Sequence, residues 1–327
     1  MNRFDSCSRH RAGELAQGDN AQGTVIPASF LADTVSMTEL PVENLRIHIE
    51  EIPVEGKPLG RHVNWDPRSL QFRVTPQPAR VLRTVRHKRI IPILNQGSLG
   101  SCTGNAATGA LGTSPIFEGL MPDHPVLDQN LAVNIYSEAT KIDPFGGTYL
   151  PTDTGSDGLS VAKVCAKKGL ISGYLHATSL EGMQTALQDT PVIIGINWYE
   201  GFDDTDANGL VKIAGQARGG HEVEVIAVDF ENQLFEAVNS WGPGYGVNGH
   251  FLFSFSDMDR LLHEYGDSTQ LLPFSVPSPQ PLVRTPEEIK FIEEYKGWRK
   301  GVFSKLTRAG RLKGAGDAMV ASWGRDL

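Results

Sequence analysis

The sequence predicts an α+β protein whose helices and strands gather in two separate lobes. Segments with the apolar spacing of helices come first along the chain. Short strand-like segments separated by Gly, Asp and Asn turns come second. At 327 residues, the chain also exceeds the length that one hydrophobic core comfortably serves. We therefore expect one two-lobed unit with an extension at each end.

The helical part is expected over about residues 86–190. A segment of small residues, TGNAATGALG, follows Cys102 and predicts a closely packed helix that begins where a Gly and Ser loop ends. Cys165 lies among apolar residues at helical spacing, so we expect it in the core. The other expected helices lie within residues 127–141, 158–171 and 179–189.

The β part is expected over about residues 191–275. The strand-like segments are residues 191–199, 221–230, 234–241 and 249–255. His221 stands at the start of the second segment and Asn239 near the end of the third. If these two strands are antiparallel neighbours joined around residues 229–233, both side chains lie side by side at one edge of the sheet.

The two ends of the chain are expected to be extensions. Residues 1–85 predict an N-terminal arm with short β-like runs at 45–49 and 71–74, and Met37 is a second plausible start. Residues 276–327 predict a Pro-rich strap followed by an amphipathic basic helix. The apolar stripe of this helix is interpreted as a docking face on the protein's own surface, with a protein partner or a membrane as the alternative.

The composition excludes several classes of function. The net charge of -8 and the pI of about 5.6 argue against nucleic acid as a partner. Three cysteines are too few for a disulfide framework. No signal peptide and no run of about 18 apolar residues is present, so we expect a cytoplasmic or virion-associated protein without a membrane span. The absence of metal and nucleotide motifs predicts no metal and no cofactor.

Cys102 is the residue that the sequence offers as a nucleophile. The positive end of a helix dipole and a neighbouring histidine both lower the pKa of a thiol. An isolated cysteine is more often a small buried residue, but His221 and Asn239 reverse that preference. We predict Cys102 as nucleophile, His221 as its base and Asn239 as the residue that orients the base. Glu222 and Glu224 alternate with valines, which predicts a solvent-facing side of the strand.

Three motifs, NQGSLGSC, GGH and NSWGPGYGVNGHF, together resemble those of papain-like cysteine peptidases over about residues 89–255. The resemblance implies a papain-like two-lobed fold with the catalytic cleft between a helical lobe and an antiparallel β lobe. It also implies that Gln96 and the backbone N–H of Cys102 form the oxyanion hole, and that Trp241 shields the hydrogen bond between His221 and Asn239.

The resemblance implies substrate contacts at Gly155, Asp157, Gly220 and Trp241. For Asp157, the cap of the following helix is the stronger interpretation. The sequence departs from the family pattern after Cys102, where Thr103 replaces the usual aromatic residue. The separation of about 120 residues between nucleophile and base is short for the family, and the family disulfides are missing. These departures suit a bacterial or phage-type intracellular member.

The predicted function is hydrolysis of peptide bonds by a cysteine endopeptidase. Cys102 is expected to form a thioester, and His221 to act first as general base and then as general acid. The expected partner is a peptide or protein substrate. Two alternatives remain open at this point: a papain-fold structural or assembly protein of the virion type, and an amidase or transpeptidase that uses the same three residues.

Overall fold

The computed structural model describes residues 44–276. The predictions for Cys7, for Met37 as a start and for the C-terminal amphipathic helix lie outside these residues. The strap is also outside them apart from its first residue, Val276. The expected domain boundaries at residues 85 and 275 therefore stay predictions.

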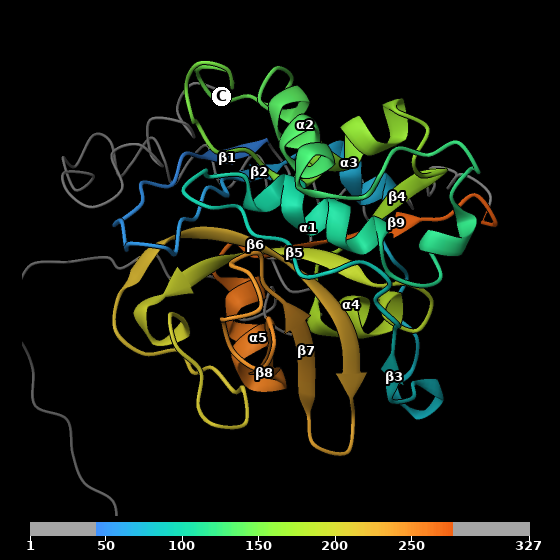
Figure 1. The fold of residues 1–327 in the computed structure, drawn as a ribbon. Helices are drawn as coiled ribbons and strands as arrows, with labels where there is room; N and C mark the ends of the chain where they lie inside the picture. Colours follow the sequence, from blue (N-terminus) through green and yellow to red (C-terminus); the bar gives the residue numbers. More distant parts are fainter. Residues whose placement is uncertain (1–43, 277–327) are drawn as a thin grey trace, which may run out of the picture. The chain divides into compact units, whose positions relative to one another are not determined.

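Three helices form one lobe above the long strands in Figure 1: α1 (Cys102–Leu111), α2 (Gln129–Ala139) and α3 (Gly158–Lys167). Every residue of α1 is buried, because α2 and α3 cover it on one side and strand β6 on the other. The small Ala and Gly residues of α1 make this close packing feasible. Cys165 is buried in the core of this lobe, as its apolar neighbours in the sequence predict.

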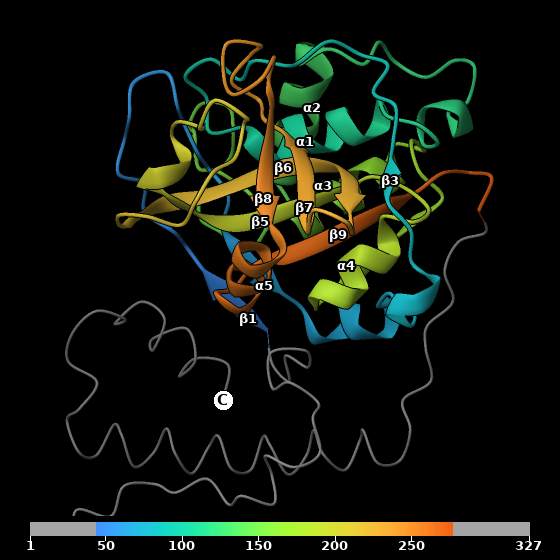
Figure 2. The same ribbon diagram turned by 90° about the horizontal axis from the view of Figure 1, so that it is seen from below.

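The second lobe is built on a seven-stranded antiparallel sheet with the order β4-β9-β5-β6-β7-β8, and β3 pairs with β6 outside this path. The strands are β3 (Val85–Arg86), β4 (Gly173–Ala177), β5 (Val192–Tyr199), β6 (Ala217–Asp229), β7 (Leu234–Val238), β8 (His250–Ser254) and β9 (Asp267–Leu272). Helices α4 (Leu180–Ala186) and α5 (Phe255–His263) lie on the side of the long strands away from α1 (Figures 1 and 2).

Each lobe has its own apolar core. One cluster joins α1, α2 and α3 to the sheet through Ile193 and Leu271. A second, aromatic-rich cluster fills the β lobe, with Trp198, Phe235 and Phe251 fully or almost fully buried. The predicted α+β class with two lobes is confirmed. Among the helices in the described part of the chain, none is long and apolar enough to cross a membrane.

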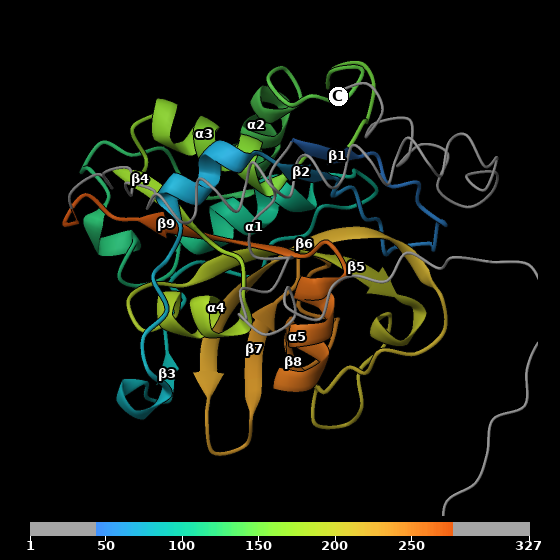
Figure 3. The same ribbon diagram turned by 180° about the vertical axis from the view of Figure 1, so that it is seen from behind.

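The N-terminal arm packs on this unit from residue 44 onward, and Figure 3 shows β1 and β2 beside the helical lobe. Strand β1 (Leu45–Ile47) pairs with β2 (Val63–Trp65) in antiparallel register. The expected β-like run at residues 71–74 is wrong for its first half, which ends the 3-10 helix Pro67–Phe72. Pro67 at the first turn and the Asp66 carboxylate, which accepts from the N–H of Arg68, start that helix.

Strand β6 corrects two predictions. It begins at Ala217, so His221 lies inside the strand and not at its start, because Gly219 and Gly220 already pair with β5. Its glutamates are also buried rather than solvent-facing: Glu222 is 0% and Glu224 1% exposed. Alternation along a strand reveals its two sides, but here both sides are covered. The sequence reasoning also did not predict β4, α5 and β9.

Candidate active site

His221 and Asn239 meet across the β6–β7 hairpin. Nε2 of His221 lies 2.8 Å from Oδ1 of Asn239, which follows directly after β7. The backbone N–H of Ser240 donates to the same oxygen at 2.7 Å, which fixes the orientation of the Asn239 amide. Because Oδ1 can only accept, Nε2 carries the proton. Nδ1 of the neutral ring is then the basic nitrogen, and it has no hydrogen-bond partner among residues 44–276.

Two indole rings hold the imidazole in place. The ring of Trp241 lies 5.0 Å from that of His221 with an angle of 31° between the planes. The ring of Trp198, from β5, meets the imidazole edge-on at 4.7 Å. All three side chains are at least nine-tenths buried. Trp241 thus takes the shielding position that the motif implies, while Trp198 is a support that the sequence analysis missed.

Cys102 begins helix α1, which packs against strand β6. Ser101 precedes it as the N-cap without a side-chain cap, and the backbone N–H of Thr103 in the first turn favours the thiolate. Gly104 lets α1 approach α2, since a Cβ there would overlap the backbone of Ala132. The backbone N–H of Glu222 hydrogen-bonds to the thiol and favours its thiolate. Because Glu222 follows His221, the thiol lies next to the part of strand β6 that carries the imidazole.

Gln96 is oriented from both ends of its amide. Its Oε1 accepts a hydrogen bond from Ser240 Oγ at 2.6 Å, and its Nε2 donates to the carbonyl oxygens of Leu99 at 2.8 Å and Pro58 at 3.3 Å. Ser240 therefore links Gln96 to Asn239. Nε2 of Gln96 thus donates to its own loop and to the segment that contains Pro58.

Pro58 belongs to residues 57–62, which we name the crossing segment because they run between the two lobes. On one wall of the cleft, the N–H of Ser156 donates to Gly60 O and the N–H of His62 donates to Ser156 O, both at 2.8 Å. On the other wall, the N–H groups of Gly60 and Arg61 donate to Gly220 O at 3.1 and 2.9 Å. Both walls thus hold the backbone of the crossing segment.

Glycines allow this close approach. A Cβ at Gly220 would overlap the carbonyl oxygen of Arg61, and a Cβ at Gly60 would overlap that of Gly100. Gly60 also has a φ of +129°, which side-chain-bearing residues rarely adopt. Gly155 and Gly220, expected as substrate contacts, lie on the two walls, and Trp241 Nε1 donates to Pro58 O at 3.0 Å.

The fold is similar to those of several solved cysteine proteases. Xylellain, a cysteine protease from Xylella fastidiosa, matches with a TM-score of 0.55 and 18% identity over 71% of this chain and 98% of that chain. The described chain has the papain fold. Digestive procathepsin L 3 of Tenebrio molitor matches with a TM-score of 0.46 and 14% identity, over 69% of this chain and 76% of that chain. The Carica candamarcensis cysteine protease CMS1MS2 matches with a TM-score of 0.42 and 16% identity, over 56% of this chain and 93% of that chain.

The sequence itself matches no family model. It matches no curated protein either. The papain fold is therefore recognisable from the three-dimensional arrangement of lobes, sheet and central helix.

Within this papain fold, the crossing segment leaves the site covered and uncharged. Cys102 and His221 are both 0% exposed. Burial raises the pKa of the Cys102 thiol far above its usual range, and the Glu222 and Glu51 carboxylates raise it further. Burial lowers the pKa of His221 to about 3 against the opposing hydrogen bond to Asn239. The expectation of a lowered thiol pKa is therefore wrong for the covered form, because loss of solvent outweighs the helix dipole.

Asp157 serves the helix and not the cleft. Its carboxylate accepts from the N–H and the hydroxyl of Ser160, both at 2.8 Å, and it is the N-cap of α3. At 1% exposure, its burial raises its pKa to about 6. The capping interpretation of the sequence therefore describes this residue better than substrate contact.

Sequence reasoning missed the charged residues beside the site, namely Arg61, Glu222 and Asp267. The only sequence signal for them was Glu222 itself, a carboxylate directly after the candidate base in an otherwise apolar strand. Within residues 44–276, no group of His, Cys, Asp and Glu side chains is arranged to hold a metal ion.

Proposed function

We propose that the protein is a cysteine peptidase that hydrolyses peptide bonds through a thioester on Cys102. The observation that carries the proposal is that the residue after His221 binds the α1 N-terminal thiol through its backbone N–H, while Asn239 holds the imidazole at Nε2 and leaves Nδ1 without a partner among residues 44–276. The papain fold supports a peptidase, and the proposed site residues add the mechanism.

In the first half of the reaction, His221 Nδ1 takes the proton of the Cys102 thiol. The thiolate attacks the substrate carbonyl carbon, and the carbonyl π electrons move to oxygen, where Gln96 Nε2 donates a hydrogen bond. The C–N bond then breaks as the imidazolium gives its proton to the leaving amine. The product of this half is a thioester and a free amine.

In the second half, a water molecule takes the place of the amine. His221 removes one proton from the water while its oxygen attacks the thioester carbon. The C–S bond breaks, the acid product leaves, and the proton returns to the sulfur. Asn239 keeps the imidazole in the orientation that serves both halves.

A peptide reaches this site only after the crossing segment has moved aside, since Cys102 has no exposed surface in the described form. Opening restores water to the thiol and the imidazole. It thereby removes the burial that now keeps both neutral. The active form is accordingly expected to hold the thiolate and imidazolium pair that the helix start favours.

Hydrolysis of a mixture of fluorogenic peptides tests the proposal. Cys102→Ala is expected to abolish turnover, while Gln96→Ala is expected to lower kcat by about 10² to 10³, the effect of one lost oxyanion donor. Gln188→Ala, which removes a glutamine far from the site, serves as the matched control. Turnover in the Cys102→Ala variant equal to that of the unsubstituted protein would overturn the proposal.

An assembly protein that keeps the fold without activity is the second candidate, and the complete burial of Cys102 favours it. It predicts no turnover in any variant and no change in turnover when the crossing segment is loosened. The peptidase proposal predicts the opposite for both measurements.

A further inference from the structure

The side chain of Arg61 reaches from the crossing segment into a pocket on the β sheet. Gly195 on β5 pairs with Glu222 on β6 and with Asp267 on β9. Paired residues of neighbouring strands send their side chains to the same face, so the two carboxylates flank a position that has no side chain. A Cβ at Gly195 would meet Arg61 Nε, a Glu222 oxygen and an Asp267 oxygen. Gly195 is thus the floor of a pocket filled by the guanidinium.

The pocket is acidic. Arg61 Nη2 pairs with Asp267 Oδ1 and donates to Tyr265 O at 2.7 Å, and Arg61 is 0% exposed. Burial, followed by the Asp267 carboxylate, raises the pKa of Glu222, and the Arg61 guanidinium opposes this rise. A cation in the pocket therefore favours the charged form of its carboxyl groups.

Arg61 does not use the whole pocket. Both carboxyl oxygens of Glu222 are buried without a hydrogen-bond partner among residues 44–276, and so are Nε and Nη1 of Arg61. Buried polar groups of a purely structural ion pair are normally satisfied. The unsatisfied atoms indicate a pocket shaped for a guanidinium that enters in another pose.

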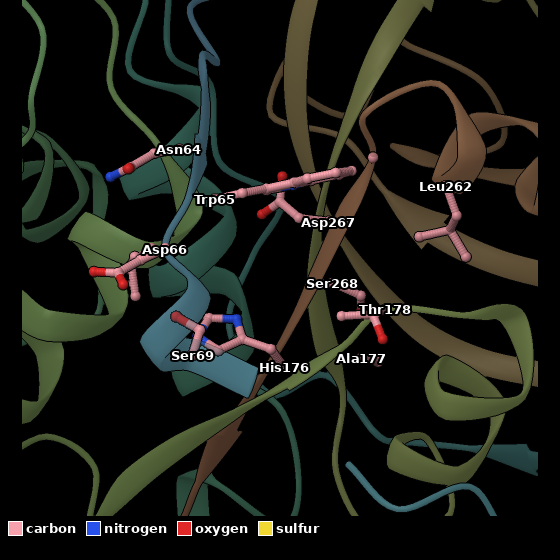
Figure 4. Close-up of a pocket in the computed structure, with 12 residues that line it drawn as sticks. Asn64, Trp65, Asp66, Ser69, His176, Ala177, Thr178, Leu262, Asp267 and Ser268 are labelled. Atoms are coloured by element: carbon pink, nitrogen blue, oxygen red, sulfur yellow. The ribbon is translucent and has the colours of Figure 1, made fainter. Parts of the chain in front are cut away.

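Asp267 connects the pocket to the surface. Its side chain is 21% exposed and lines an open hollow together with Trp65 and His176. Figure 4 labels Asp267, Trp65 and His176 among the residues that line this hollow. Asp267 is therefore the pocket carboxylate with access to solvent, whereas Glu222 is enclosed.

The backbone contacts of the crossing segment show how a peptide lies beside the pocket. Main-chain hydrogen bonds to Ser156 and Gly220 hold any extended peptide, whatever its sequence. Specificity must then come from the side chain that enters the sheet pocket. The carboxylates of Glu222 and Asp267 match the fork of a guanidinium, and a neutral side chain would leave them unpaired.

The geometry points to an arginine-specific substrate pocket formed by Glu222, Asp267 and Gly195, which Arg61 occupies in the covered form. The inference rests on the proposed peptidase function and names its substrate class: peptides with an arginine side chain near the scissile bond.

Peptide pairs that differ only by arginine or its neutral isostere citrulline test the pocket. Arginine is placed at the first, second or third residue before the scissile bond. The full chain carries Gly60→Val or, as a second opening variant, Arg61→Ala. Binding of labelled peptides is measured with Cys102→Ala also present, and hydrolysis is measured with Cys102 intact.

We expect arginine to be preferred over citrulline at one position by about 10- to 10²-fold in Kd and in kcat/KM, the effect of one charge-assisted hydrogen-bond network. Asp267→Asn should remove the preference. Glu236→Gln, which removes a carboxylate paired with Arg86 elsewhere, should keep it.

The two readouts separate the two claims. Hydrolysis of arginine and citrulline peptides at equal rates at every position overturns the pocket and leaves the peptidase proposal intact. Preferred binding of arginine peptides without hydrolysis supports the pocket and overturns the peptidase proposal. Equal binding of the two peptides in both opening variants overturns the pocket whatever the activity.

Discussion

Asn239 Oδ1 receives two N–H groups, one from the imidazole of His221 and one from the backbone of Ser240. The hydrogen bond from Ser240 fixes the Asn239 amide in the orientation in which its oxygen accepts from His221. The bond to Asn239 raises the pKa of His221, against the larger lowering by burial. A neutral side chain thereby tunes both the orientation of the imidazole and its readiness to hold a proton.

Replacement of Asn239 by Ala should damage activity less than replacement of His221 by Ala. His221→Ala removes proton transfer altogether, whereas Asn239→Ala frees the ring to sample unproductive orientations, so we expect a fall of about 10 to 10² in kcat/KM. Because the lost bond raised the imidazole pKa, the basic limb of the pH profile should move to lower pH and the profile should narrow.

The measurement is kcat/KM against pH for wild type and both variants in the opened form. An Asn239→Ala enzyme with the width and rate of wild type would show that another residue orients the imidazole.

At the scale of elements, the crossing segment and the strand β6 fit one another through glycines on both. The segment lies between Gly100 and Gly220 with no room for a Cβ at Gly60. The segment is anchored by Leu59, which is fully buried, and by the ion pair of Arg61 with Asp267. We therefore expect substrate access to be controlled by the equilibrium between docked and released states of this segment.

Gly60→Val should shift that equilibrium toward release. Overlap with Gly100 and the positive φ together are expected to destabilise the docked state by about 1–3 kcal/mol, which corresponds to about 10- to 10²-fold more released form. The alkylation rate of Cys102 measures this increase in the released form. Gly169→Val, at a positive φ but with open space around it, is the control. An unchanged alkylation rate in Gly60→Val would mean that the segment does not limit access.

Acid should release the same segment through His62. Its Nδ1 accepts from the N–H of Ile49 at 3.1 Å and its Nε2 contacts Thr154 O at 2.6 Å, so the docked ring is neutral. Burial lowers the pKa of His62 from 6.5 to about 4; the bond to Thr154 opposes this, while the charges of His48 and Arg61 add to it.

A released ring takes up a proton below about pH 6.5, which the docked ring resists until about pH 4. Release should therefore increase as pH falls through this window, by up to about 10². The rate of hydrogen exchange at residues 49–62, corrected for its intrinsic pH dependence, measures this release. In His62→Gln the exchange should no longer depend on pH in this window; an equal rise in both proteins would exclude His62 as the cause.

At the scale of the whole molecule, the sequence predicted what local patterns determine. Helix α1 follows from its run of small residues, α2 and α3 follow from apolar spacing, and the meeting of His221 with Asn239 follows from one hairpin. The crossing segment was not predictable, because its contacts with Gly220 join residues far apart along the chain. The burial of Glu222 escaped the sequence analysis for a related reason: alternation does not show whether both sides of a strand are covered.

The central claim is that Cys102 is a nucleophile that the fold keeps covered. The most direct measurement is labelling of the full chain and of Gly60→Val with an epoxide inhibitor of papain-like enzymes, followed by mapping of the adduct by mass spectrometry. We expect one adduct, on Cys102, that forms faster in Gly60→Val and is lost in His221→Ala. An adduct on Cys7 or Cys165 with Cys102 unmodified, or an unreactive Cys102 in the opened variant, would contradict the account.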